Sequence, residues 1–187
     1  MATTKTGLMS EEMYREIALG DPKWELLHGH LREKPGMSVR HGAVMIFVVE
    51  QLLLQLDRST FTLRANHARL RHSADTYYIP DVVVIPVTME SALRERPRTL
   101  DAYSEPLPLV IEIWSPSTGE YDIKAKVPAY QERGDAEIWF IHPYERTLTV
   151  WRKQPDGRYT EDIHRGGVVP VSSLPGVAID LDDLLDG

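Results

Sequence analysis

Cysteine is absent from the 187-residue sequence. Its absence excludes a disulfide framework, a thiolate zinc site, an iron–sulfur cluster and a cysteine nucleophile. No apolar run approaches the ~20 residues that a membrane-spanning helix needs, and the opening segment MATTKTGLMSEEM lacks the apolar core of a signal peptide. We therefore expect a soluble, cytoplasmic protein that does not bind a membrane.

Basic residues are also fewer than acidic residues in this sequence. The chain has 21 Lys and Arg against 28 Asp and Glu, which gives a formal net charge of −7. A broad polycationic surface is therefore excluded, and any contact with nucleic acid must be local or assisted by a divalent metal. The sequence also lacks a His-Glu-x-x-His pair, a Walker-type phosphate loop, a dinucleotide-binding glycine pattern and a Gly-x-Ser-x-Gly elbow.

What the sequence does contain is a series of helical and strand-like segments that predicts one domain over residues 1–187. Ser10 can cap a first helix, and a Gly-containing turn after residues 24–27 predicts a β-hairpin. Strand-like runs follow at residues 63–65, 68–71, 82–85, 109–114, 138–141 and 147–151. This order predicts an α/β (α+β) fold in which helices flank a central mixed sheet.

Three expectations concern details of this fold. Alternating apolar and basic residues in 63–65 and 68–71 predict an antiparallel pair of strands with one exposed face. Residues 88–106 are polar and contain proline, which predicts a loop with one helical turn. A helix over residues 39–57 is apolar around most of its circumference, so we expect it to be central or to pack in a homodimer or higher homo-oligomer.

Two carboxylates occur where apolar strands are expected. Glu112 interrupts the apolar run 109–114, and a buried carboxylate needs a partner or a metal ion. Asp81 directly precedes the β-branched run 82–85. Two carboxylates at the ends of neighbouring strands can share one hard cation such as Mg²⁺.

A lysine follows these acids on the next predicted helix. Asp122 and Lys126 are four residues apart and share a face of a continuous helix, from which Lys126 can reach back over the strand of Glu112. Pro128 interrupts or begins the regular part of this helix, so the choice between Lys126 and Lys124 stays open.

Each of these residues also has an ordinary structural interpretation. Asp81 can be a strand-start residue, Glu112 can form a buried salt bridge with an arginine, and both lysines can lie on a solvated face. Arg69 and Arg71 project from one face of a predicted strand and are candidates for contact with phosphate, although exposed strand faces often carry arginine.

These acids and the lysine belong to a longer series of segments that follow one another along the chain. The series consists of residues 24–29, His41 and residues 79–84, 109–118, 122–130, 134 and 137–141. In this combination the sequence resembles the Uma-two family of restriction endonucleases, whose members fold like the PD-(D/E)XK nucleases. The resemblance covers residues 8–184. One departure is Trp114, which stands where the Glu-x-Lys pattern of those nucleases has its lysine.

The resemblance implies a restriction-endonuclease-like fold and hydrolysis of nucleic-acid phosphodiesters, with DNA as the expected substrate and Mg²⁺ or Mn²⁺ as cofactor. It implies metal ligation by Asp81, Glu112 and the backbone carbonyl of Ile113, and catalytic roles for Asp81, Glu112 and Lys126. The accessory site residues would be Glu25, His41, Asp122 and Lys124. Two alternatives stay open: a catalytically silent nucleic-acid-binding or assembly protein that retains the nuclease fold, and a metal-assisted hydrolase of another phosphoester.

Overall fold

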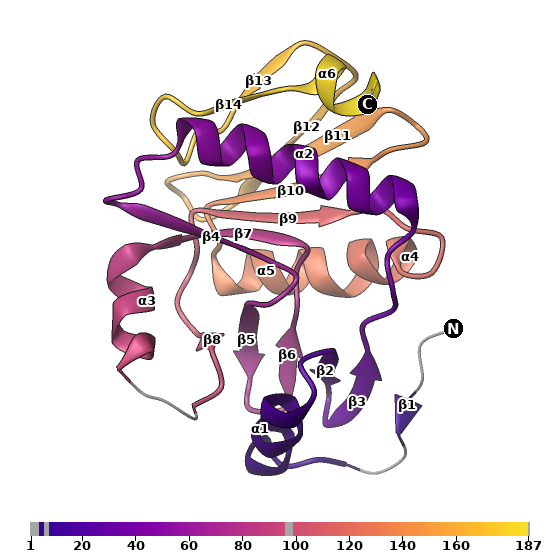
Figure 1. Cartoon of the computed structure of the whole chain (residues 1–187), viewed down its shortest axis with the longest axis vertical. Coiled ribbons are helices and arrows are strands. Elements are labelled where there is room, and N and C mark those ends of the chain that lie inside the picture. Colours follow the sequence, from indigo (N-terminus) through magenta and orange to yellow (C-terminus); the bar gives the residue numbers. More distant parts are fainter. Residues whose placement is uncertain (1–3, 6–7, 96–98, 187) are drawn as a thin grey trace.

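A computed structural model describes residues 4–5, 8–95 and 99–186 and shows helices on both faces of a central mixed sheet (Figure 1). The sheet has six strands in the order β12–β11–β10–β9–β7–β4. These strands are β4 (Phe61–Ala65), β7 (Val82–Pro86), β9 (Leu109–Ile113), β10 (Glu137–His142), β11 (Thr147–Lys153) and β12 (Tyr159–His164). Only β9 and β10 are parallel among these described pairs, which confirms the predicted mixed sheet.

Two helices cover opposite faces of this sheet. Helix α2 (Val39–Gln55) begins at Ser38, whose side chain accepts a hydrogen bond from the backbone of His41, as the sequence predicts. Its residues Val48 and Leu52 pack on one face of the sheet, and Tyr130 of α5 (Val127–Arg133) packs on the other. Because side chains alternate along a strand, the central strands bury residues against both helices.

A second six-stranded sheet has the order β1–β3–β2–β6–β5–β8 and lies at the lower end of the view in Figure 1. Its strands are β1 (Thr4–Lys5), β2 (Trp24–Leu27), β3 (His30–Glu33), β5 (Arg69–Ser73), β6 (Thr76–Tyr78) and β8 (Ala102–Tyr103). Strands β2 and β3 form the predicted hairpin. Helix α1 (Glu11–Gly20), capped by Ser10 as predicted, packs beside this sheet.

The expected antiparallel pair of residues 63–65 and 68–71 is wrong, because the two segments belong to different sheets. Strand β4 pairs with β7, whereas β5 pairs with β6 and β8. The chain turns at Asn66, which has a positive φ of 54°. The backbone N–H of Asn66 donates to the carbonyl of Asp81, so this turn marks the point where the chain leaves the central sheet.

The loop expected at residues 88–106 contains more helix than predicted. Helix α3 (Val87–Arg94) extends beyond a single turn, and residues 96–98 lie outside the described part of the chain. Glu90 of this helix is buried and forms ion pairs with Arg64 and Arg94. One ion pair with β4 and one within the helix therefore stabilise a segment whose polar composition is typical of a loop.

The last elements extend the cover of the central sheet. They are α4 (Gly119–Tyr121), the π-helical segment η1 (Asp122–Lys126), β13 (Val168–Pro170), β14 (Ala178–Asp180) and α6 (Leu181–Asp186). Gln51 and Gln55 of α2 form hydrogen bonds with the backbone of β14. In the described ranges, no helix is both long and apolar enough to span a bilayer. Ile46 and Leu54 of α2 face outward, and the homo-oligomer expected from this helix stays a prediction.

Two glycines make a matched test of packing beside the central sheet. A Cβ atom on Gly119 would overlap the indole ring of Trp114, whereas a Cβ on Gly42 of α2 would meet no atom within 4 Å. Gly119→Ala should therefore lower the free energy of unfolding by about 1–3 kcal/mol, the usual cost of overpacking. Gly42→Ala should raise it by about 0.5–1 kcal/mol, because alanine favours the helix. Urea denaturation measures both changes, and equal stability of the Gly119→Ala protein and the wild type would contradict this packing.

Candidate active site

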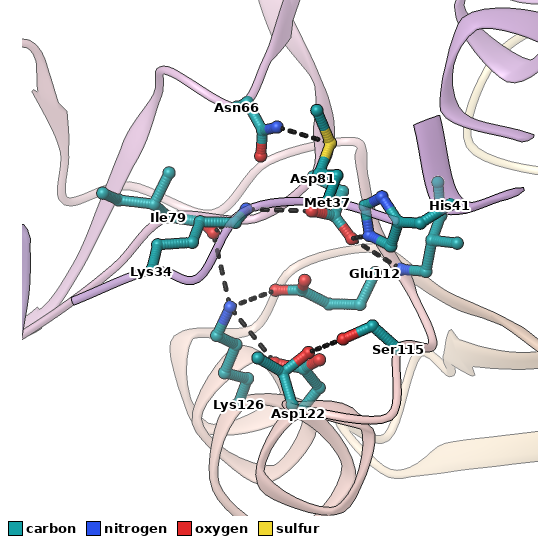
Figure 2. A network of polar contacts seen from close by, with 12 residues as sticks. Lys34, Met37, His41, Asn66, Ile79, Asp81, Glu112, Ser115, Asp122 and Lys126 are labelled. Carbon is teal, nitrogen blue, oxygen red and sulfur yellow. Dashed lines mark hydrogen bonds and ion pairs between the residues drawn. The ribbon is translucent and has the colours of Figure 1, made fainter. Parts of the chain in front are cut away.

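The two acids predicted from the sequence meet at one end of the central sheet. Strands β7 and β9 are antiparallel neighbours in which Val82 pairs with Ile111. Extending this register by one pair places Asp81, which precedes Val82, opposite Glu112, which follows Ile111 (Figure 2). Both side chains are buried. The expectation that these acids come from neighbouring strands is confirmed.

Asp81 is surrounded by hydrogen-bond donors. Its Oδ1 lies 2.9 Å from the Nζ of Lys34, and its Oδ2 lies 3.0 Å from the Nε2 of His41. The backbone N–H of Ile113 also donates to Oδ2, at 2.8 Å. Burial by itself raises the pKa of Asp81, but the Lys34 ammonium and the hydrogen bond with His41 outweigh burial and hold that pKa well below its ordinary value. Asp81 is therefore an ionised carboxylate.

Glu112 has a different environment at the same sheet end. Its Oε1 accepts a hydrogen bond from the hydroxyl of Tyr130 at 2.6 Å and lies 3.1 Å from the Nζ of Lys126. Its Oε2 is buried and has no hydrogen-bond partner among the described residues. Burial raises the pKa of Glu112 to about 8; Lys126 opposes this rise, and the negative charges of Asp122 and Asp81 add to it.

Lys126 occupies the centre of the acidic cluster. Its Nζ lies 3.0 Å from Glu25, 3.1 Å from Glu112 and 3.3 Å from Asp122, and it donates to the carbonyl of Ile79 at 3.3 Å. Burial lowers the pKa of Lys126, but the surrounding carboxylates outweigh it and raise that pKa well above the ordinary value. A charged ammonium therefore balances three carboxylates that come from three different elements.

The π-helical turn decides which lysine enters the cluster. Pro128 has no backbone N–H to donate, and the N–H of Val127 reaches back to the carbonyl of Asp122. This arrangement keeps Lys126 beside Asp122 and inside the protein. Lys124 is exposed and pairs with Glu120. The sequence left open whether Lys124 or Lys126 faces Glu112, and in the structure it is Lys126.

Trp114, the departure from the Glu-x-Lys pattern, lies outside this cluster. Its indole ring stacks on the ring of His142 with centroids 4.4 Å apart, and it packs against Gly119. The ammonium next to Glu112 is therefore supplied from η1 instead of from the strand itself.

The two arginines considered for phosphate contact lie on the second sheet, where they hold α1 in place. Arg69 is 2% exposed and donates to the carbonyls of Ala18 and Pro22. Arg71 is half-buried and forms an ion pair with Glu11. The expectation of an exposed strand face is wrong for Arg69, because α1 covers that face. A phosphate contact by Arg71 stays a prediction.

Three residues of the site were missed by sequence reasoning. Tyr130 follows Lys126 by four residues, and this helical spacing could have identified it. Arg32 and Lys34 come from β3 and the segment after it, and they line the same cavity as Asp81. No local pattern marks either residue, because the folding of the second sheet brings them to the central one.

The donor set of this cavity suits a hard cation. Carboxylate oxygens, which Asp81 and Glu112 bring to its lining, are the ligand type that Mg²⁺ and Mn²⁺ take, and the unpartnered Oε2 of Glu112 is a buried oxygen that a cation would satisfy. Ile113 is not among the lining residues, and its backbone N–H is the group that contacts Asp81, so ligation by its carbonyl stays a prediction. Within the part of the chain that the structure describes, no three His, Asp or Glu side chains form a ready-made metal cluster. Two carboxylates supplemented by waters are the usual protein contribution to a Mg²⁺ site.

A mixed sheet whose adjacent strand ends carry a buried Asp and Glu beside a lysine is the arrangement that we expect of a restriction-endonuclease-like protein. Over residues 11–182 the chain matches Uma2, a family described as "putative restriction endonuclease", and it belongs to that family. The resemblance seen in the sequence is thereby confirmed.

A solved structure shares this fold. It is the crystal structure of a "putative nuclease belonging to DUF820" from Anabaena variabilis, which matches with a TM-score of 0.74 and 18% sequence identity over 95% of this chain and 98% of that one. Among curated proteins, none matches the chain.

In metal-free protein, Glu112 should keep its proton at neutral pH, because its pKa is raised from 4.5 to about 8. A raised pKa means that the folded state binds this proton more tightly than the unfolded chain. The contribution of Glu112 to the free energy of unfolding is therefore fully present below about pH 4.5 and is lost as the pH rises through about 8. Carboxyl ¹³C NMR titration measures the pKa, and urea denaturation across this range measures stability.

Glu112→Gln is neutral at every pH and should flatten this decline in stability. Glu120→Gln is the matched control, because the hydrogen bond from Lys124 lowers the pKa of that exposed carboxylate. The control should keep the pH dependence of the wild type. A titration that returned the ordinary carboxyl pKa for Glu112 would contradict the burial described for it.

The two lysines of η1 should differ sharply when each is replaced by methionine. Lys126→Met leaves three buried carboxylates without their shared cation, and breaking a buried pair in this way costs about 3–5 kcal/mol of stability. Lys124→Met removes only an exposed pair and should leave stability within error. Urea denaturation compares the two variants. Lys126→Met should also raise the pKa of Glu112 further, an NMR readout that lost packing alone would not produce.

Proposed function

We propose that this protein is a metal-dependent endonuclease that hydrolyses phosphodiester bonds in DNA, with Asp81, Glu112 and the carbonyl of Ile113 as its metal ligands. The observation that carries this proposal is the buried acid pair at the ends of β7 and β9. Membership of a family described as restriction endonucleases supports the same reaction.

Asp81 and Glu112 differ in ionisation and in hydrogen bonding before a metal ion binds. Asp81 is already ionised, and the N–H of Ile113 holds one of its oxygens in place. Glu112 is held through Oε1 by Tyr130 and Lys126, which leaves Oε2 available as a ligand. Bound Mg²⁺ or Mn²⁺ would supply Lewis-acid polarisation of a phosphoryl oxygen and a water of lowered pKa.

Lys126 acts in this proposal as a positioning residue. Four oxygen atoms surround its ammonium group and the side chain is 2% exposed, so its donors are directed at protein groups. It holds Glu112 in place and favours the ionised form of that carboxyl group. Its contribution to the reaction passes through Glu112.

Binding of the nucleic acid must work against an overall charge of −7. Arg32 and Lys34 place two cations in the lining of the cavity, and Arg40 lies exposed at the start of α2. These are local contacts, as the composition requires, and divalent metal would further reduce repulsion of the phosphate backbone.

Single-turnover assays on labelled DNA test this function. With Mn²⁺, wild-type protein should cleave covalently closed circular DNA as well as linear DNA, which separates an endonuclease from an exonuclease. Asp81→Asn and Glu112→Gln should each slow cleavage by at least ~100-fold, the cost of losing one charge-stabilising group in a transition state. Glu120→Gln, an exposed carboxylate on α4, should cleave like the wild type.

Two other outcomes would replace the proposal. DNA binding with no cleavage under any divalent metal would indicate the catalytically silent binding protein. Cleavage of RNA or of small phosphoesters that DNA does not compete for would retain the metal site and change the substrate. Undiminished cleavage by Glu112→Gln would remove the acid pair from the reaction.

A further inference from the structure

Lys34 is the cation nearest to Asp81. Its Nζ lies 2.9 Å from Oδ1 of Asp81 and donates to the carbonyl of Ile79 at 2.7 Å (Figure 2). Lys34 directly follows β3, and residues 34–37 line the cavity that also contains Asp81 and Glu112. The side chain of Lys34 is 14% exposed, whereas that of Lys126 is 2% exposed.

We propose that the Lys34 ammonium occupies the cation position at Asp81 in metal-free protein, and that Lys34 and a divalent metal exclude one another there. Lys34 thus regulates loading of the site, since metal enters only when this side chain moves out. The proposal rests on the proposed function, because it takes Asp81 as a metal ligand.

The size of the cavity supports mutual exclusion. Its volume is about 20 Å³, which is enough for about one water molecule. Mg²⁺ keeps several of its waters when it binds to one or two carboxylates. A hydrated ion therefore needs more space beside Asp81 than the cavity offers, and the ammonium of Lys34, 2.9 Å from Oδ1, occupies the space next to that oxygen.

The charges that line the cavity lead to the same conclusion. The lining contains four carboxylates and three cations: Glu25, Asp81, Glu112, Asp122, Arg32, Lys34 and Lys126. When every carboxylate is ionised, as ligation of a metal requires of Glu112, their sum is −1. A divalent ion added beside Lys34 brings the sum to +1, whereas the same ion with Lys34 in solvent brings it to 0. Because uncompensated charge is costly in a buried site, metal binding favours release of one cation.

Of the three cations, Lys34 is the one that can leave. Lys126 is buried among three carboxylates. Arg32 pairs with Glu25, and its guanidinium lies 3.2 Å from the centre of the Tyr121 ring. Lys34 is held by one carboxylate and one carbonyl, and its long side chain reaches the site from the cavity rim.

Metal affinity, measured without any assay of activity, tests the proposal. Metal-stripped wild type, Lys34→Met and Lys34→Arg are titrated with Mn²⁺, and free Mn²⁺ is followed by electron paramagnetic resonance. Lys34→Met should bind Mn²⁺ on the order of 10- to 100-fold more tightly, because one competing charge-assisted hydrogen bond is gone. Lys34→Arg should stay near the wild type, as should Lys23→Met, which removes a lysine paired with Glu33 outside the cavity.

Equal or weaker binding by Lys34→Met would overturn the proposal, since a purely structural salt bridge predicts no gain in affinity. The test also separates this proposal from the proposed function. If the wild type binds Mn²⁺ and Asp81→Asn abolishes binding, the metal site stands whatever Lys34 does. If neither the wild type nor Lys34→Met binds Mn²⁺, both proposals fail.

A second measurement needs no substitution and therefore does not depend on a variant folding. In ¹⁵N-lysine-labelled wild type, the Lys34 ammonium signal should be protected from exchange with water in metal-free protein and lost on saturation with Mg²⁺. The buried Lys126 signal should persist in both states and serves as the internal control. A Lys34 signal that survives saturation with Mg²⁺ would show that both cations fit at Asp81, and the proposal would be wrong.

Discussion

The ammonium group of Lys126 is the interaction on which the rest of the site depends. It balances Glu25 of β2, Glu112 of β9 and Asp122 of η1, so it joins the second sheet, the central sheet and the helical segment behind them. Each of these carboxylates would be costly to bury alone. The cluster is therefore both a junction between parts of the fold and the wall of the candidate active site.

The surroundings of this junction give Asp81 and Glu112 different pKa values. Asp81 and Glu112 lie at one sheet end, yet the pKa of Asp81 is lowered and that of Glu112 is raised to about 8. Burial raises the pKa of both acids. At Asp81 the Lys34 ammonium and the hydrogen bond with His41 outweigh burial, whereas at Glu112 the charge of Lys126 opposes burial and the negative charges of Asp122 and Asp81 add to it. In metal-free protein Asp81 is thus ionised, whereas Glu112 keeps its proton until a further cation binds beside it.

Local sequence patterns determined much of this protein. The apolar runs around Asp81 and Glu112 identified the central strands, because strands buried on both faces carry continuous β-branched and apolar residues. The same context indicated that Glu112, if buried, needed a partner or a metal ion, and it placed Asp81 directly before a buried strand. Ser10 and Ser38 marked the starts of two helices through capping, which depends only on neighbouring residues.

Tertiary structure alone decided the remaining features, because each depends on segments far apart in the chain. The assignment of β4 and β5 to different sheets follows from their pairing partners, which local alternation does not specify. Arg69 is buried because α1 packs over its strand. Lys126 was selected over Lys124 by the π-helical turn before Pro128. Lys34 reaches Asp81 because the second sheet folds against the first, a contact between residues 47 positions apart that no spacing rule predicts.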